Sequence, residues 1–232
     1  MSNPRDDIET MIDSDNLEGM IRKAGELHGH FCPFLSLGVR AGYLAVKKLQ
    51  SKAKGMEKVL AIVETNSCFS DGVQMVTGCT FGNNSLIYED LGKTAFTLTR
   101  RDEKGMRIVV KPEFGHLLKE RYPQYSKLLE KVITQRKGSE QEKIEMMEFG
   151  EKVCFDLLKI EAGKIFKMER VEVEIPLYAP IFESVICSQC KESLMKSRAM
   201  VKNGKIMCIT CGGGKYYQLD GGGITEIEEE DD

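Results

Sequence analysis

Two cysteine pairs close to the C-terminal end place the strongest constraint on how this chain folds. One pair is Cys-Ser-Gln-Cys at 187–190 and the other is Cys-Ile-Thr-Cys at 208–211, with 17 residues between them. Each C-x-x-C turn can bring two thiolates to one ion, and two such turns complete a tetrahedral site. Asn203-Gly204, between the pairs, is typical of a two-residue hairpin turn, which brings the second pair back to face the first. We therefore predict one structural zinc site. Its ligands are Cys187, Cys190, Cys208 and Cys211.

Disulfide bonds and a rubredoxin-like iron centre are the alternatives for these four cysteines. The N-terminal segment MSNPRDDIET has no basic region followed by an apolar stretch, so it does not have the pattern of a secretory signal. We expect a cytoplasmic protein, in which cysteines more often bind metal than form disulfides. Four thiolates fill the coordination sphere of zinc, so this site is expected to hold a small module together and not to catalyse a reaction.

The length and composition allow one large core and a small appended module. The chain has 232 residues, of which 41% are hydrophobic and 30% are charged, as in soluble globular proteins. No apolar run reaches the roughly 18 residues that a membrane span needs, so we expect no membrane association. We predict a core domain at 1–180, a zinc-finger domain at 181–220 and a solvated acidic tail at 221–232.

Helical and strand patterns alternate irregularly along the predicted core domain. The predicted helices cover 14–29, 33–52, 71–77, 113–121, 123–136 and 139–160, and the predicted strands cover 59–64, 85–89, 95–99, 106–111 and 165–175. This mixture favours an α+β fold over a doubly wound sheet. Gly38 and Gly42, one turn apart in the second helix, would let another backbone approach closely, either within the monomer or across a dimer interface.

Two histidines and a cysteine lie together ahead of a helix that begins at a proline. They are His28, His30 and Cys32, and Pro33 fits the first position of the helix, which makes Cys32 its cap. A helix N-terminus favours a thiolate over a thiol, and imidazole with thiolate suits zinc, nickel or iron. The alternative is that both histidines end the preceding helix and that Cys32 is a small buried residue.

A second cysteine cluster follows the predicted strand 59–64. Cys68 lies in the loop after the strand, and such loops often carry sites. Asp71 is a further candidate, although with Gln74 three residues later it also fits a helix cap. Without a metal, Cys32 or Cys68 is a candidate nucleophile or redox thiol, and Asp71 supports them. Three residues have less certain roles. Cys79 could join this site or pack beneath it, Lys111 could place a cation near it, and Cys154, in an apolar helix, is expected in the core.

The order of these motifs resembles the FmdE family of formylmethanofuran dehydrogenase proteins. The resemblance covers about residues 15–215. It rests on the runs HGHFCP at 28–33, CFSDGVQ at 68–74 and GCTFGN at 78–83, followed by the two C-x-x-C pairs. It implies an α+β core domain with a cleft near the histidine and cysteine positions. It also implies a C-terminal zinc finger of treble-clef or ribbon type and a homodimer.

The resemblance does not assign a reaction to this chain. In the assembled dehydrogenase, the reduction of carbon dioxide to a formyl group belongs to other chains, which hold a molybdenum or tungsten pterin and iron–sulfur clusters. Other subunits of such a molybdenum or tungsten enzyme are therefore expected partners, and whether this chain is itself an enzyme stays open.

We predict a metal-binding accessory or redox-related protein with structural zinc and a second metal or thiolate site in the core. The predicted core ligands are His28, His30, Cys32 and Cys68. The alternative is a regulatory or adaptor module that binds a partner through its basic ribbon, because residues 187–220 carry six basic and two acidic side chains, a balance of +4. Since the whole chain has a formal net charge of −3, nucleic-acid binding is expected to be weak.

Overall fold

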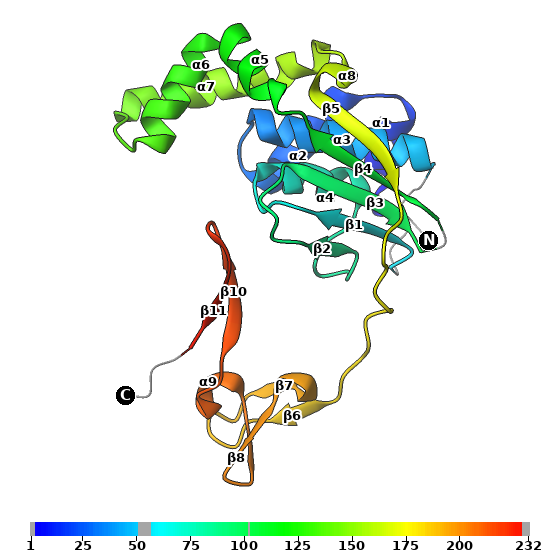
Figure 1. Cartoon of the computed structure of the whole chain (residues 1–232), viewed down its shortest axis with the longest axis vertical. Coiled ribbons are helices and arrows are strands. Elements are labelled where there is room, and N and C mark those ends of the chain that lie inside the picture. Colours follow the sequence, from blue (N-terminus) through cyan, green and yellow to red (C-terminus); the bar gives the residue numbers. More distant parts are fainter. Residues whose placement is uncertain (1–2, 51–56, 102, 229–232) are drawn as a thin grey trace. The chain divides into compact units, whose positions relative to one another are not determined.

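The computed structural model describes residues 3–50, 57–101 and 103–228. The chain divides into two compact units, Met1–Ile175 and Pro176–Asp232 (Figure 1). Helices and strands are mixed irregularly in the first unit, and the second unit contains short hairpins. The predicted α+β class is therefore confirmed. The division falls five residues ahead of the predicted boundary at 180.

The first unit is built on a five-stranded sheet with the strand order β2-β1-β3-β4-β5. Strands β1 and β2 are parallel and the other pairs are antiparallel. The predicted hairpin at 95–99 and 106–111 is confirmed, with Phe96 opposite Ile108. Alternate side chains of the central strands enter the core, because successive residues point to opposite faces. The strands are β1 (Val59–Val63), β2 (Leu86–Tyr88), β3 (Ala95–Arg100), β4 (Gly105–Val110) and β5 (Phe166–Val171).

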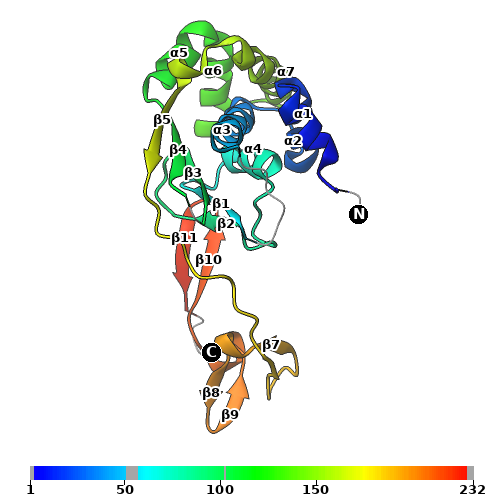
Figure 2. The ribbon, with the colours of Figure 1, turned by 90° about the vertical axis from the view of Figure 1, so that its right-hand side faces the viewer.

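Four helices precede or interrupt this sheet in sequence, and Figure 2 shows them on one side of it. They are α1 (Asp6–Asp13), α2 (Leu17–His28), α3 (Pro33–Leu49) and α4 (Cys68–Thr77). Two of their boundaries differ from the prediction: α2 begins three residues later than 14, and α4 begins three residues earlier than 71. The last two residues of the predicted range 33–52 lie outside the described residues.

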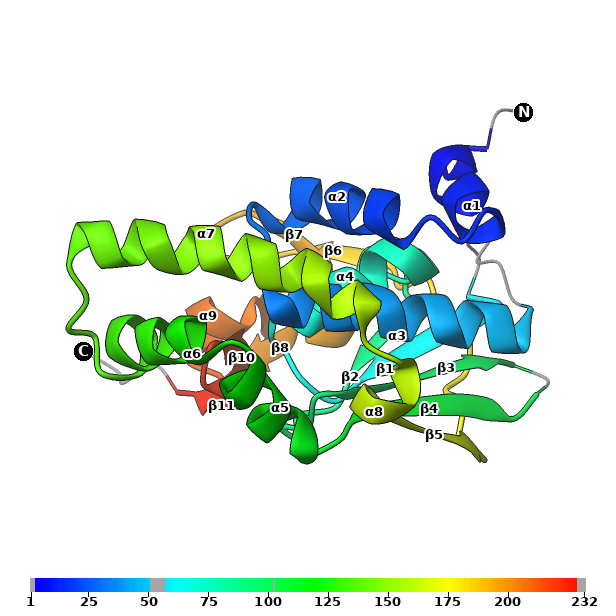
Figure 3. The same ribbon diagram turned by 90° about the horizontal axis from the view of Figure 1, so that it is seen from above.

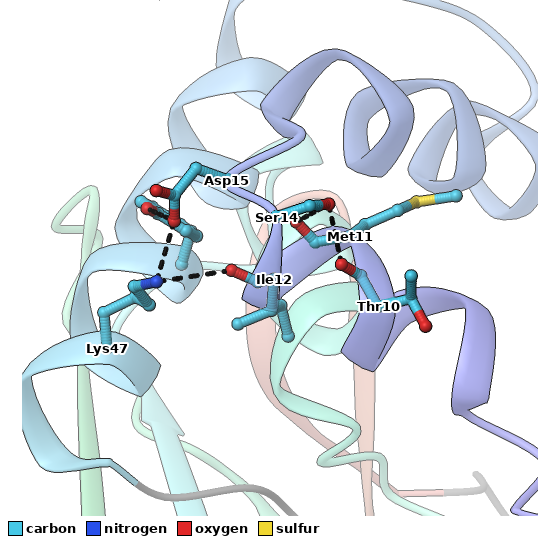
Figure 4. Close-up of polar contacts among 7 residues, drawn as sticks. Thr10, Met11, Ile12, Ser14, Asp15 and Lys47 are labelled. Carbon is cyan, nitrogen blue, oxygen red and sulfur yellow. Dashed lines mark hydrogen bonds and ion pairs between the residues drawn. The ribbon is translucent and has the colours of Figure 1, made fainter.

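Helix α1 was not predicted, although it is amphipathic. Its apolar residues Ile8 and Ile12 are buried against the core, while its first turn is acidic. The link to α2 is tied to α3 by Asp15, whose Oδ1 accepts hydrogen bonds from Lys47 Nζ at 2.7 Å and Tyr43 Oη at 2.6 Å (Figure 4). These contacts fix the start of α2 relative to α3.

Helices α3 and α4 touch backbone to backbone, because glycines face each other across the contact. A Cβ added to Gly38 would lie 1.9 Å from the carbonyl oxygen of Phe69, and one added to Gly72 would lie 2.5 Å from that of Leu35. Real Cβ atoms cannot approach so closely, so only glycine fits these positions. Gly42 likewise faces Val76 of α4. Close packing within the monomer therefore accounts for Gly38 and Gly42.

The remaining helices of the first unit form an antiparallel helical pair, in which α6 and α7 run side by side and α7 also contacts α3 (Figure 3). A capping box between Ser139 and Glu142 starts α7. The predicted single helix at 123–136 is divided into α6 and a π-helical turn, and the predicted strand at 165–175 ends at Val171. The elements are α5 (Glu113–Arg121), α6 (Pro123–Leu129), the π-helix Glu130–Thr134, α7 (Glu140–Asp156), the 3-10 helix Leu157–Lys159 and α8 (Ala162–Ile165).

The second unit consists of three hairpins and one short helix. Asn203 and Gly204 both have positive φ, as the predicted hairpin turn requires. The expected acidic tail at 221–232 is corrected over its described part, because Gly223–Ile227 is a strand that pairs with Tyr216–Asp220. The elements are β6 (Ser184–Ile186), β7 (Ser193–Met195), the 3-10 helix Lys196–Arg198, β8 (Met200–Lys202), β9 (Lys205–Met207), α9 (Ile209–Gly212), β10 (Tyr216–Asp220) and β11 (Gly223–Ile227).

None of the helices in the described part of the chain combines the length and the apolar character needed to cross a lipid bilayer.

Candidate metal centres

The four C-terminal cysteines converge at one point of the second unit. The first pair occupies the turn between β6 and β7, and the second pair lies at the start of α9. A hydrogen bond from Ser188 N–H to the carbonyl of Ile206, at 2.8 Å, holds the two turns together. The four sulfurs lie within 4.8 Å of one another, and those of Cys190 and Cys208 are 3.9 Å apart. Two thiolates on one tetrahedral zinc are separated by about 3.8 Å. The arrangement therefore fits a zinc ion.

The electrostatics of these cysteines also call for a cation. Backbone N–H groups, that of Cys208 first, lower the pKa of Cys187 to about 6. The neighbouring Cys208 thiol instead raises the pKa of Cys211 to about 12. Four adjacent sulfurs cannot all carry negative charge without a compensating ion, and a bound metal removes this conflict because it ionises its thiol ligands outright.

A second cluster of donor atoms lies in the first unit, where three helix ends meet. His28 is the last residue of α2, His30 lies in the link to α3, Cys32 is the N-cap of α3, and Cys68 is the first residue of α4. One ligand atom from each of the four lies within 4.8 Å of the others. These are the four residues predicted as core ligands from the sequence, and the structure brings them together.

The link between α2 and α3 is held in place by glycine and aromatic packing. Gly29 ends α2 with φ +84°, a left-handed conformation that reverses the chain between the two histidines. Phe31 stacks on Phe155 of α7 with ring centroids 5.3 Å apart, and its ring fills the space above Gly25, where a Cβ would lie 2.3 Å from it. His30 is exposed, whereas the other three donors are partly buried.

His28 is oriented by a carboxylate from α4. Its Nδ1 donates to Asp71 Oδ2 at 2.7 Å, and its Nε2 lies 4.0 Å from Cys32 Sγ. A proton on Nδ1 leaves the lone pair of Nε2 facing the sulfurs, which is how a carboxylate fixes a metal-binding histidine. The predicted capping role of Asp71 is wrong, because α4 begins earlier, with Ser67 as its N-cap. Gln74 does contact Asp71, through Nε2 to Oδ1 at 3.2 Å.

The two core cysteines have opposite pKa shifts. The Cys32 thiol donates to Cys68 and lowers the pKa of Cys68 to about 6, an effect that His28 and His30 reinforce and burial opposes. The same contact raises the pKa of Cys32, and burial adds to this. Cys32 Sγ also accepts the N–H of Leu35 at 3.4 Å, which confirms its predicted place as the helix cap. Without a cation the pair holds one negative charge; a metal would ionise both thiols.

The other sequence candidates lie outside this cluster. Cys79 is buried at the far end of α4 and donates to the carbonyl of Val59 at 3.6 Å, and burial raises its pKa to about 11. Cys154 is buried in the core as predicted, and burial raises its pKa to about 12. Lys111 Nζ donates to the carbonyl of Gly163 at 2.6 Å.

Tyr125 of α6 is a neighbour of the cluster that the sequence did not indicate. Its pKa is raised first by burial and then by the negative charge of nearby sulfurs, Cys32 and Cys68 among them. Nothing in the local sequence connects a tyrosine on α6 with cysteines at the starts of α3 and α4, so only the tertiary packing reveals it.

Two family models match this chain. The model described as "FmdE, Molybdenum formylmethanofuran dehydrogenase operon" matches residues 27–167, and that of the prokaryotic dksA/traR C4-type zinc finger matches residues 180–217. The first range includes the four core donors. The second includes the four C-terminal cysteines and identifies the second unit as a zinc-binding module.

One similar protein is a "Probable S-adenosyl-L-methionine-binding protein" of Archaeoglobus fulgidus. It is 44% identical over 219 residues, which are 92% of this chain, and the chain spans 58% of the relative's length. A similar solved structure is that of an FmdE-like protein of tungsten formylmethanofuran dehydrogenase from Syntrophus aciditrophicus. It has a TM-score of 0.50 and 22% identity, and the match covers 85% of this chain and 92% of that one. On the family model that matches more than half of its length, the chain belongs to the FmdE family.

Proposed function

We propose that the core cluster is a second metal site, with His28, His30, Cys32 and Cys68 as ligands and Asp71 as the residue that positions His28. The observation that carries this proposal is the convergence of four donor atoms within 4.8 Å from three helix ends. Two imidazoles and two thiolates suit zinc first, and nickel or iron next. A nitrogen and a sulfur bound to one zinc ion are separated by about 3.6 Å, close to the 4.0 Å between His28 Nε2 and Cys32 Sγ.

The exposure of His30 gives this site a chemical use that the C-terminal site lacks. An exposed ligand on a link between helices can be displaced by a substrate more easily than three partly buried ligands at helix ends. A metal with an exchangeable position can polarise a carbonyl group or lower the pKa of a bound water. The residues that would touch such a substrate are Cys32 and Cys68, and Asp71 acts through His28.

We propose an accessory or redox-related role for the whole chain, in line with the formylmethanofuran dehydrogenases named for its family and for its solved relative. A homodimer and association with other subunits of a molybdenum or tungsten enzyme remain proposals. The thiolate sites require a reducing compartment, so the proposal assumes the cytoplasm. Because the chain spans 58% of the Archaeoglobus fulgidus relative, the proposal does not extend to S-adenosyl-L-methionine.

The alternative role, an adaptor that binds a partner through a basic ribbon, has less support. Lys196 pairs with Glu183 at 2.8 Å, and Lys215 pairs with Glu226 at 3.2 Å and Glu228 at 3.1 Å. These acidic neighbours reduce the positive charge that a phosphate-bearing partner would meet.

The test is the metal content of the full chain purified without added metal. We expect two metal ions per chain in the wild type, and one in Cys68→Ser and in Cys208→Ser, because each variant loses a different site. His30→Ala should weaken metal retention in the core, whereas His116→Ala, which changes an exposed histidine elsewhere, should leave it unchanged. One metal per chain in the wild type, lost only in Cys208→Ser, would refute the core site.

A further inference from the structure

The two core cysteines are placed as a reactive dithiol as well as a ligand pair. Cys32 and Cys68 are 36 residues apart in the sequence, yet their sulfurs lie within 4.8 Å of each other, and both thiols are free. Both side chains are partly exposed, so a small reagent can reach them. By contrast, Cys79 and Cys154 are buried.

The backbone holds the two cysteines at this separation independently of any metal. The Leu35 carbonyl lies against Gly72, and the Phe69 carbonyl lies against Gly38. These contacts are within one helical turn of the cysteines at the starts of α3 and α4, so neither helix can slide or separate without breaking them. The sulfurs need only side-chain rotation to come within bonding distance of about 2.05 Å.

We propose that Cys32 and Cys68 form a reversible disulfide in the metal-free protein. A low-molecular-weight disulfide is the co-reactant. One cysteine sulfur, as thiolate, attacks a sulfur of that reagent, forms a mixed disulfide and releases one small thiol. The other cysteine attacks the bound sulfur, forms the Cys32–Cys68 bond and releases the second small thiol. The two protons lost by the cysteines end on the two released thiols, and the two electrons reduce the reagent.

The disulfide has a consequence for metal binding that rests on the proposed function. A disulfide removes both sulfur ligands in one two-electron step and leaves His28 and His30, which lie on opposite sides of the turn at Gly29. Metal and disulfide therefore exclude each other at this site. The redox state of the surroundings would then decide whether the core holds a metal ion.

The test is peptide mapping of the full chain after chelation and treatment with oxidised glutathione. Cleavage at lysine and arginine places Cys32 in the peptide 24–40 and Cys68, with Cys79, in the peptide 59–93. We expect these two peptides to be linked, and dithiothreitol to separate them. Cys79→Ser should keep the link. Cys68→Ser should abolish it and leave the peptide 24–40 carrying one glutathionyl group, because the second attack has no nucleophile.

A parallel sample loaded with zinc separates this proposal from that of the core metal site. Zinc at about 100 times its dissociation constant should slow the linkage about a hundredfold if only metal-free protein reacts. Linkage at an unchanged rate would support the disulfide and refute zinc binding in the core. Metal-free protein in which both cysteines take up glutathione and the peptides stay unlinked would overturn the disulfide proposal.

Discussion

The two clusters of four donor atoms differ in what holds them together. In the second unit, two turns supply four cysteines, and short hairpins that bury little apolar surface surround them. In the first unit, the donors lie at the ends of helices packed on a five-stranded sheet, and glycine contacts fix two of these helices against each other. A metal ion would supply much of the folding energy of the second unit, whereas the first unit presents its donors from a core that folds without one. Substitutions in each unit can test this difference.

The largest expected effect is loss of structure in the second unit when its metal ligand is removed. Cys208→Ser should release the zinc and unfold residues 184–227, because three ligands cannot hold hairpins that lack a core. Amide hydrogen exchange should rise in this range and stay unchanged in the core helices. Gln189→Ala, inside the first C-x-x-C turn but not a ligand, is the matched control. Protection of the second unit in Cys208→Ser would contradict its dependence on metal.

The next effect concerns the helix contact behind the core cluster. Gly38→Ala places a Cβ 1.9 Å from the Phe69 carbonyl and should force α3 away from α4, lowering the free energy of unfolding by about 3 kcal/mol. Separation of the helices should also weaken metal retention by the core. Denaturant unfolding and metal analysis measure the two effects.

Gly115→Ala is the control for Gly38→Ala. It also lies in a helix, but a Cβ there meets no atom within 4 Å, so alanine should change stability by no more than about 1 kcal/mol, in the stabilising direction. Equal effects of the two substitutions would show that helix contact does not position the cluster.

The sequence predicted the ligands of both clusters better than it predicted what surrounds them. Metal-binding spacing and a proline-started helix are local features, so Cys187, Cys208 and Cys32 could be recognised directly. The role of Asp71 could not, because its partner His28 is 43 residues away and the local Asp-x-x-Gln pattern favoured a cap. Contacts between distant segments are decided by tertiary packing, which local patterns do not encode.

The elements that the sequence missed have physical reasons of the same kind. Helix α1 is only eight residues long and mostly polar, and it depends on its packing against the core. Strand β11 contains acidic residues that are typical of a solvated tail, yet Glu226 is paired with Lys215 on the neighbouring side of the hairpin. Composition alone could not reveal that pairing.

A smaller effect is expected from the carboxylate that positions His28. Asp71→Asn keeps the size of the side chain but weakens the acceptor for Nδ1, so core metal affinity should fall about 10-fold to 100-fold. Competition with a chromophoric chelator measures it. Glu18→Gln, on the same helix as His28 and in an exposed ion pair with Arg22, should leave the affinity unchanged. Equal losses in both variants would mean that Asp71 acts only as a surface charge.

The smallest effect tests the electrostatics of the core cluster without metal. Hydrogen bonding from Cys32, aided by His28 and His30, lowers the pKa of Cys68 to about 6. A lowered pKa means that the thiolate, which is the reactive form, persists above about pH 6 and is lost below it. The alkylation rate of Cys68 by iodoacetamide in metal-free protein should therefore be nearly constant above pH 7 and fall about tenfold between pH 7 and pH 5. Cys154 should stay unreactive until the protein unfolds, because burial raises its pKa to about 12. Cys32→Ala removes the donor and should move the midpoint for Cys68 upward, whereas a wild-type midpoint near about 8.5, the value of a free cysteine, would show that the neighbours do not stabilise the thiolate.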